Sequence, residues 1–208
     1  MALSKGEPLQ FARRDPPVAS VGRECVTDQG DLINNPVTGE TIVFLKRAGD
    51  TDGQVLQMEL LLEADGPRML EHVHPRQEER IEVVSGTLRF RLGGEEQELG
   101  AGQALVLPPG VPHTLWNVGE GQARCLFDVR PALKTEAAFE TLFGLAREGK
   151  TNKQGMPNPL QGALLAREYE TFLPRPPVPL QRVVLAIIAP IARLFGYRAR
   201  YEKYSGPK

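Results

Sequence analysis

Alternating apolar and polar residues predict a series of short strands in the middle of the chain. In the segment TLRFRL, three apolar residues (Leu88, Phe90 and Leu92) alternate with Arg89 and Arg91, which is typical of a half-buried strand. Further strands are predicted at residues 40–46, 54–62, 79–85, 97–99, 104–107 and 122–129. Short, evenly spaced strands separated by glycine and proline turns favour an all-β sandwich or barrel over βαβ units.

The spacing of apolar residues changes to a helical period after Pro131. Residues 135–147 place Phe139 and Phe143 four apart, which predicts an amphipathic helix packed across the barrel. A second helix is predicted to begin at residues 158–159, where asparagine precedes a proline at the first helical position. The C-terminal third is therefore expected to be helical.

The segment 180–197 differs from an ordinary amphipathic helix. Its central run, VVLAIIAPIA, is apolar on all sides, which predicts burial on more than one face. The run is shorter than the roughly 20 residues that span a bilayer. We expect it to pack against the barrel or a second subunit. The alternatives are a helix on a membrane surface and a lid over the barrel mouth. The membrane alternative rests on basic residues that outnumber Glu202 around the run: Arg182, Arg193, Arg198, Arg200 and Lys203.

These patterns divide the chain into three parts. Residues 1–30 are polar and without a period, so they are expected to form a loosely attached N-terminal arm. Residues 31–131 carry the strand pattern and form the β domain. Residues 132–208 form a helical C-terminal extension that packs on the barrel or on a dimer partner.

All three histidines of the chain fall between residues 66 and 117. His72 and His74 flank a single residue, so in an extended strand both imidazoles point to the same face. Glu79 follows five residues later, and His113 comes after an intervening hairpin. A lone histidine is usually structural. Three imidazoles with one carboxylate, however, form a mixed nitrogen and oxygen metal site.

Glycines and prolines surround these residues at fixed intervals. Residues 66–86 read GPRMLEHVHPRQEERIEVVSG, and residues 102–117 read GQALVLPPGVPHTLWN. The two segments resemble the motifs of the cupin family, G-x5-H-x-H-x4-E-x6-G and G-x5-P-x-G-x2-H-x3-N, with every position filled. The resemblance implies a double-stranded β-helix, or jelly-roll, over residues 31–131. Strand alternation places only one of Glu78 and Glu79 on the inner face, and the motif spacing selects Glu79.

The resemblance also implies a cofactor and partners. One divalent metal ion would be held inside the barrel by His72, His74, Glu79 and His113. Such ligands suit iron, manganese, nickel, zinc or copper, so the sequence does not select the metal. The resemblance further implies a small-molecule substrate and a homodimer built through the edges of the jelly-roll, to which the apolar C-terminal segment would be suited.

Composition limits the remaining classes of function. The chain has 208 residues and a formal net charge of -1, so no basic field is present to attract nucleic acid. Cys25 and Cys125 are expected to be reduced thiols, and no apolar leader follows a basic start, which favours a cytoplasmic location. The motif GxSxG is absent, which argues against hydrolase-elbow chemistry.

Three functions follow from this reasoning. The first is a dioxygenase-type oxidoreductase in which Glu79 doubles as a base, with an apolar pocket formed by Ile81, Val83, Phe90 and Leu115. The second is metal-assisted isomerase, lyase or hydrolase chemistry, which needs no oxygen. The third is a cupin that binds a metabolite without transforming it.

Overall fold

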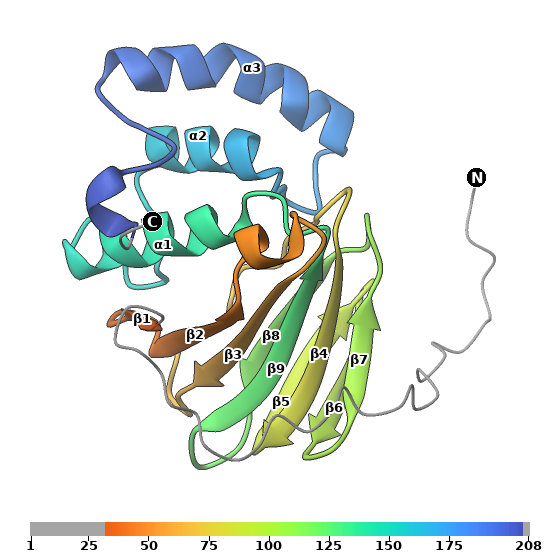
Figure 1. Cartoon of the computed structure of the whole chain (residues 1–208). Coiled ribbons are helices and arrows are strands. Elements are labelled where there is room, and N and C mark those ends of the chain that lie inside the picture. Colours follow the sequence, from red (N-terminus) through yellow and green to blue (C-terminus); the bar gives the residue numbers. More distant parts are fainter. Residues whose placement is uncertain (1–31, 206–208) are drawn as a thin grey trace.

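A computed structural model gives the fold of residues 32–205 (Figure 1). The predicted N-terminal arm, residues 1–30, lies outside the described residues, as does Cys25. A barrel of strands forms one half of the molecule, and three helices stack in successive layers beyond one end of it (Figure 1).

Nine strands between residues 32 and 205 form two sheets in which every pairing is antiparallel. The larger sheet has the order β1-β2-β3-β9-β4-β7, and the smaller has the order β6-β5-β8. The bounds are β1 Leu32–Asn35, β2 Glu40–Lys46, β3 Leu56–Leu62, β4 Glu78–Ser85, β5 Thr87–Leu92, β6 Glu95–Gly100, β7 Ala104–Leu107, β8 His113–Asn117 and β9 Ala123–Arg130.

The observed strands follow the alternation of the sequence closely. Strands β2, β5 and β7 have the predicted bounds; β3 and β4 differ from theirs by one or two residues at the start, and β6 and β9 differ by one or two residues at both ends. The edge strand β1 is not predicted, because Asn34, Asn35 and Pro36 have the composition of a turn. Its four residues pair with β2 through backbone hydrogen bonds, and the pattern of side chains does not predict such pairing.

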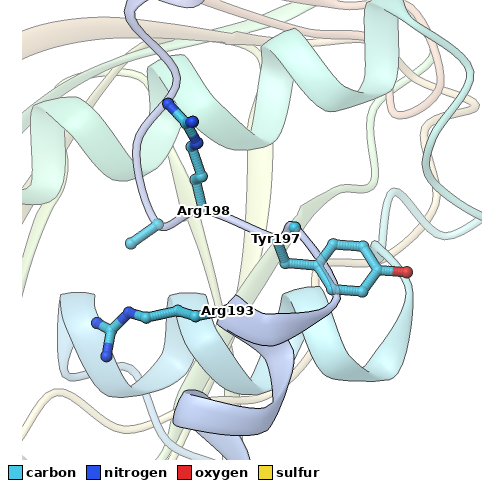
Figure 2. A pocket seen from close by; sticks show the side chains of 5 residues that line it. Arg193, Tyr197 and Arg198 are labelled. Atoms are coloured by element: carbon cyan, nitrogen blue, oxygen red, sulfur yellow. The ribbon is translucent and has the colours of Figure 1, made fainter.

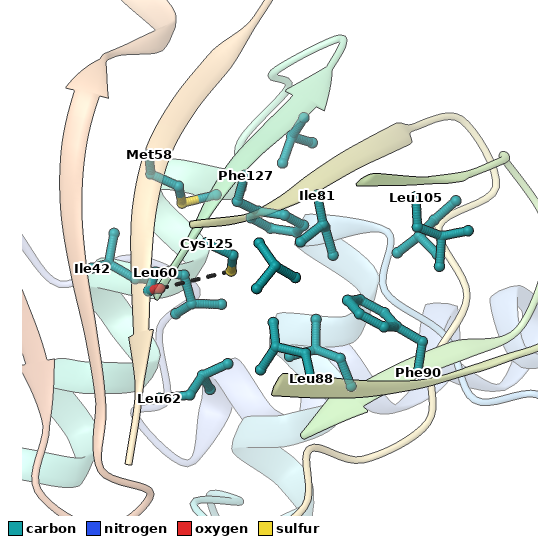
Figure 3. Close-up of a cluster of buried hydrophobic side chains, with 14 of the residues drawn as sticks. Ile42, Met58, Leu60, Leu62, Ile81, Leu88, Phe90, Leu105, Cys125 and Phe127 are labelled. Carbon is teal, nitrogen blue, oxygen red and sulfur yellow. Dashed lines mark hydrogen bonds between the residues drawn. The ribbon is translucent and has the colours of Figure 1, made fainter. Parts of the chain in front are cut away.

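The inner faces of the two sheets form one hydrophobic core (Figure 3). Met58 and Ile81 of the larger sheet and Leu88 and Phe90 of the smaller sheet are fully buried. Each belongs to the inward-facing set of its strand, so the period of two in the sequence becomes the wall of the barrel.

Two glycines of the sequence motifs are required by close backbone contacts. Gly86 has a φ of +83°, and a Cβ there would lie 2.8 Å from Ala123 Cα. A Cβ at Gly66 would lie 2.5 Å from the backbone oxygen of Thr38. A larger residue at either position would push neighbouring backbone apart.

The first two helices follow the barrel and agree with their predicted starts. Helix α1, Thr135–Arg147, has the predicted bounds and packs Phe139 and Phe143 against the barrel core. Helix α2, Pro159–Tyr169, begins where the Asn158 side chain accepts a hydrogen bond from the backbone N–H of Leu160. A short 3-10 helix, η1, spans Ala48–Thr51, and another, η2, spans Glu202–Tyr204.

Helix α3, Val178–Leu194, packs on α2 and forms the outermost layer of the molecule (Figure 1). Its inner face buries Ala189 and Ala192 against Leu164 of α2. Its opposite face is exposed, which differs from the burial that its composition predicts. None of the helices between residues 32 and 205 has the length and apolarity needed to cross a membrane.

Candidate metal centre

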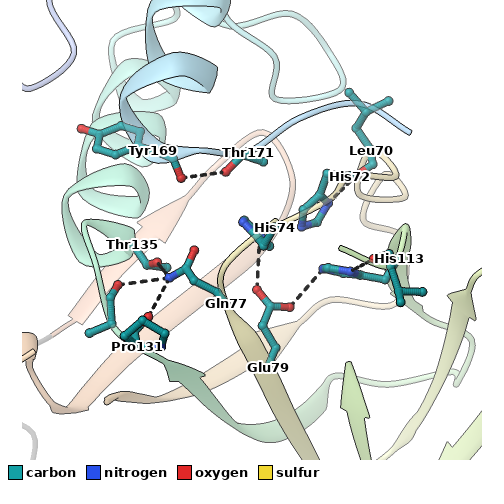
Figure 4. Close-up of polar contacts among 12 residues, drawn as sticks. Leu70, His72, His74, Gln77, Glu79, His113, Pro131, Thr135, Tyr169 and Thr171 are labelled. Atoms are coloured by element: carbon teal, nitrogen blue, oxygen red, sulfur yellow. Dashed lines mark hydrogen bonds and ion pairs between the residues drawn. The ribbon is translucent and has the colours of Figure 1, made fainter. Parts of the chain in front are cut away.

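Four side chains from three parts of the barrel converge on one point (Figure 4). His72 and His74 come from the segment between β3 and β4, Glu79 is on β4, and His113 begins β8. One potential ligand atom from each lies within 4.8 Å of the others. His74, Glu79 and His113 are buried, whereas Glu78 is exposed. The four sequence-predicted residues are thus brought together, and the cluster could hold a metal ion.

Backbone bridges position the two histidines of the first motif. The sequence predicts a strand through His72 and His74, but the structure has two isolated bridges there instead. His72 N–H donates to His113 O at 3.0 Å, and His113 N–H donates to His72 O at 2.9 Å. Val73 and Phe172 exchange a second pair of hydrogen bonds, at 2.8 and 3.0 Å. The segment is therefore extended between β8 and the loop that follows α2.

Two of the imidazoles are oriented by backbone carbonyls. His72 Nδ1 lies 2.8 Å from Leu70 O, and His113 Nδ1 lies 2.9 Å from Val111 O. A carbonyl only accepts hydrogen bonds, so each Nδ1 carries the proton and donates. In the neutral ring, Nε2 is then left with a free lone pair. This outer-shell arrangement is typical of metal-binding histidines.

The contacts of Glu79 indicate that a cation belongs between the carboxylate and the rings. Oε1 is 3.3 Å from His74 Nε2, and Oε2 is 3.1 Å from His113 Nε2. His113 Nε2 is buried and, among the described residues, makes no hydrogen bond of acceptable geometry. An unprotonated Nε2 and a carboxylate oxygen both present lone pairs, so they repel each other at this distance unless a proton or metal ion lies between them. The donor set therefore fits a divalent ion.

Burial and mutual charge shift the pKa values of the cluster. Burial, followed by repulsion from His74 and His113, lowers the pKa of His72 to about 3. Burial also lowers the pKa of His74, and the charge of Glu79 only partly opposes this. Burial would lower the pKa of His113 too, but the contact with Glu79 and its charge raise it. For Glu79, burial raises the pKa, yet the contact with His113 and the charge of the imidazoles bring it to about 2. The carboxylate is thus ionised at neutral pH.

The residues predicted to line a substrate pocket belong to the barrel core, where Figure 3 labels Ile81 and Phe90. Ile81 and Val83 follow Glu79 on the same face of β4, and Leu115 follows His113 on β8, where it pairs with Phe90. All four are between 0% and 4% exposed. They form an apolar floor below the site, and their contact with a substrate stays a prediction.

Four positioning groups were not predicted from the sequence. The carbonyls of Leu70 and Val111 each lie two residues before a histidine, but every residue has a carbonyl, so no side-chain pattern reveals them. Phe172 is a hundred residues from His72. Gln77, which is 2% exposed, ties the loop before β4 to the start of α1: its amide donates to Pro131 O at 3.0 Å and to Thr135 Oγ1 at 2.7 Å (Figure 4).

Residues 58–129 match the family model described as a cupin domain, and this region contains all four clustered side chains. The barrel is a cupin domain. The match and the two antiparallel sheets confirm the predicted jelly-roll, with helices following the sheets.

Sequence relatives of this cupin occur among polyketide synthase proteins. It is 40% identical over 74 residues to "Polyketide synthase CurC" of Streptomyces cyaneus, which covers 36% of this chain and 48% of that protein. It is 34% identical over 83 residues to "Tetracenomycin polyketide synthase protein TcmJ" of Streptomyces glaucescens, covering 40% of this chain and 54% of that protein. The chain spans about half the length of the curated relatives it matches.

Among solved structures, an RmlC-like cupin from Shewanella frigidimarina aligns with a TM-score of 0.44 and 18% identity, covering 52% of this chain and 89% of that chain.

Proposed function

We propose that this cupin binds one divalent metal ion through His72, His74, Glu79 and His113, and that it oxidises a small metal-chelating substrate as a dioxygenase-type enzyme. The observation that carries the proposal is the convergence of the four side chains within 4.8 Å, with two imidazoles held by backbone carbonyls so that Nε2 faces the centre. Iron, manganese, nickel, zinc and copper all suit this ligand set.

The side chains of the site have separate roles in this proposal. When bound, the ion supplies a Lewis acid with open coordination positions. His72 and His113 hold their rings in a fixed tautomer, because each Nδ1–H is engaged by a carbonyl. Glu79 is ionised and buried, and it would act as a base once it has swung off the ion, when a carboxylate oxygen is free to accept a proton from an acidic substrate hydroxyl or enol. The apolar floor of Ile81 and Leu115 excludes water from below.

The apolar floor and the relatives suggest the substrate class. The relatives are named as polyketide synthase proteins, and polyketide chains carry carbonyl groups in 1,3 relation. Such a group loses a proton readily and can chelate a cation through two oxygens. We therefore propose a 1,3-dicarbonyl or catechol-like compound with an apolar or aromatic body as the substrate.

A second function is favoured by the names of these relatives, since assembly of a polyketide does not in itself require oxygen. In this alternative the same site would catalyse an isomerisation, an elimination or a hydrolysis, with Glu79 moving the proton. A cupin that binds such a metabolite without transforming it is the non-catalytic form of the same proposal.

Oxygen uptake separates these functions. The protein loaded with iron(II) is mixed with diketones, flavonoids and catechols, and dissolved oxygen and product are followed. We expect uptake with a chelating substrate and its loss in Glu79→Gln. Glu82→Gln serves as the matched control, because Glu82 lies on β4 but on the opposite face, where it pairs with Arg80 at 2.8 Å. Product formed equally without oxygen would favour the second function. No uptake with any substrate at full metal occupancy would count against the first.

We further propose a homodimer formed through sheet edges, for which β7 and β6 are available as terminal strands of the two sheets. Analytical ultracentrifugation tests this proposal.

A cytoplasmic location is proposed as well. It is in keeping with Cys125, a buried free thiol whose pKa is raised to about 12 by burial.

A further inference from the structure

The outer face of α3 is a continuous apolar surface. On this face Ile187 is 64% exposed, Leu194 is 87% exposed and Phe195, just after the helix, is 71% exposed. Leu180, Val183, Val184 and Ile191 share the same side and are between 43% and 59% exposed. Exposed apolar clusters of this extent mark interaction surfaces in globular proteins. Because α3 is the outermost layer of the molecule, this face is directed away from the barrel (Figure 1).

The charge around this face has one sign. Between residues 171 and 201 the chain has five arginines and neither aspartate nor glutamate, although the whole chain has a net charge of -1. Arg182 and Arg193 lie along the helix and are 50% and 53% exposed. Both reach toward half-buried carboxylates on or next to α2, Glu170 at 3.7 Å and Glu168 at 3.9 Å, so they lie on the side of the helix opposite the apolar face; contacts of this length are weak.

A basic pocket opens at the C-terminal end of the helix (Figure 2). It has a volume of about 370 Å³ and is lined by Arg193, Gly196, Tyr197, Arg198 and Ala199. Figure 2 shows the guanidinium groups of Arg193 and Arg198 extending away from the ring of Tyr197. The two guanidinium groups extend in different directions, so each offers a separate contact to an anionic headgroup at this end of the helix, since guanidinium groups bind phosphate oxygens with good geometry.

We infer that α3 lies on an anionic lipid bilayer, with its outer face among the acyl chains near the surface and with Arg193 and Arg198 at the headgroup phosphates. A helix with a wide apolar face, a basic opposite side and no acidic residue is suited to this position. A second copy packed through α3 would cover the apolar face but would bring these arginines no acidic partner from the same segment, because residues 171–201 of each copy contain neither aspartate nor glutamate; an anionic bilayer supplies phosphates. The inference is independent of the reaction proposed for the metal centre.

Vesicle flotation with the full chain tests the inference. Vesicles of phosphatidylcholine alone are compared with vesicles that also contain phosphatidylglycerol. Ile187→Glu and Leu194→Glu place a carboxylate at exposed positions, so both variants should fold, which circular dichroism verifies. Val84→Glu is the matched control, because Val84 is 41% exposed at the end of β4 that is far from the metal centre.

We expect the wild type and Val84→Glu to float with the anionic vesicles and not with the neutral ones. Each glutamate in α3 should lower binding by about tenfold, and about 0.5 M salt should lower binding of the wild type severalfold. The inference is overturned if the wild type does not bind anionic vesicles, or if the α3 variants bind like the wild type. It is also overturned if sedimentation shows that these variants dissociate a dimer, since a second copy would then cover the face.

Discussion

Gly144 in the middle of α1 gives a sharp test of how the C-terminal residues pack. Replacing a helical glycine by alanine normally stabilises a protein by about 1 kcal/mol, because alanine restricts the unfolded chain more. At Gly144, however, the ring of Tyr204 lies against the helix. A Cβ there would be 2.5 Å from Tyr204 Cδ1 and Cδ2, and closer still to Cγ. The ring is part of a buried cluster with Leu145 and Leu165, so it has little room to move.

Gly162 in α2 provides the matched control. A Cβ at this position would meet only Pro157 Cγ, at 3.9 Å, which is ordinary van der Waals contact. Both glycines are inside helices, so the gain in helix propensity cancels between the two variants. The difference that remains is the cost of overpacking against Tyr204, about 1–3 kcal/mol. Gly162→Ala should be more stable than the wild type by up to about 1 kcal/mol, whereas Gly144→Ala should be less stable or unchanged.

Urea unfolding followed by circular dichroism measures both free energies. A third protein, carrying Gly144→Ala together with Tyr204→Ala, separates the steric effect from other causes. With the ring removed, alanine at position 144 should be stabilising relative to Tyr204→Ala alone. If Gly144→Ala raises the free energy of unfolding as much as Gly162→Ala does, the packing of Tyr204 on α1 is refuted.

Three further predictions concern the metal centre and its motif. His72→Ala or His113→Ala should remove most of the bound metal, whereas Cys125→Ala should not; equal metal content by elemental analysis would reject the ligand assignment. A proton competes with the metal at His113, whose pKa is raised above 6.5, while His72 and His74 have lowered pKa values and stay neutral. Zinc affinity should therefore fall about tenfold for each pH unit below the pKa of His113. Competition with a chelator measures this affinity, and an affinity that does not change with pH would contradict the prediction. Asn117→Ala should retain metal, but its free energy of unfolding should fall by about 2–4 kcal/mol in chemical denaturation. The buried Asn117 side chain donates hydrogen bonds to Leu62 O and Gly121 O and accepts one from Gly119 N–H, and alanine would lose all three. Unchanged stability would oppose this structural role.

Local periodicity accounts for what could be predicted of the fold. The alternation of Leu88, Phe90 and Leu92 follows from strand geometry alone, and the same pattern in neighbouring segments was enough to predict a barrel. The start of α2 was predictable because asparagine and proline have position-specific preferences there. Strand β1 was not, since its partner β2 supplies hydrogen bonds that its own side chains do not encode.

The amino-acid sequence by itself determined the inward face of the predicted strands, because residue spacing and turn-forming residues act over short range. It indicated the four clustered side chains through their match to the two cupin motifs, which also selected Glu79 over Glu78. Only the tertiary structure decided how those side chains are held. The bridges from His72 to His113 and from Val73 to Phe172 join distant backbone groups, which are chemically alike at every residue. The exposure of α3 was also a tertiary result: burial depends on which surfaces are already occupied, and within residues 32–205 the inner face of α3 meets α2 while its outer face stays uncovered.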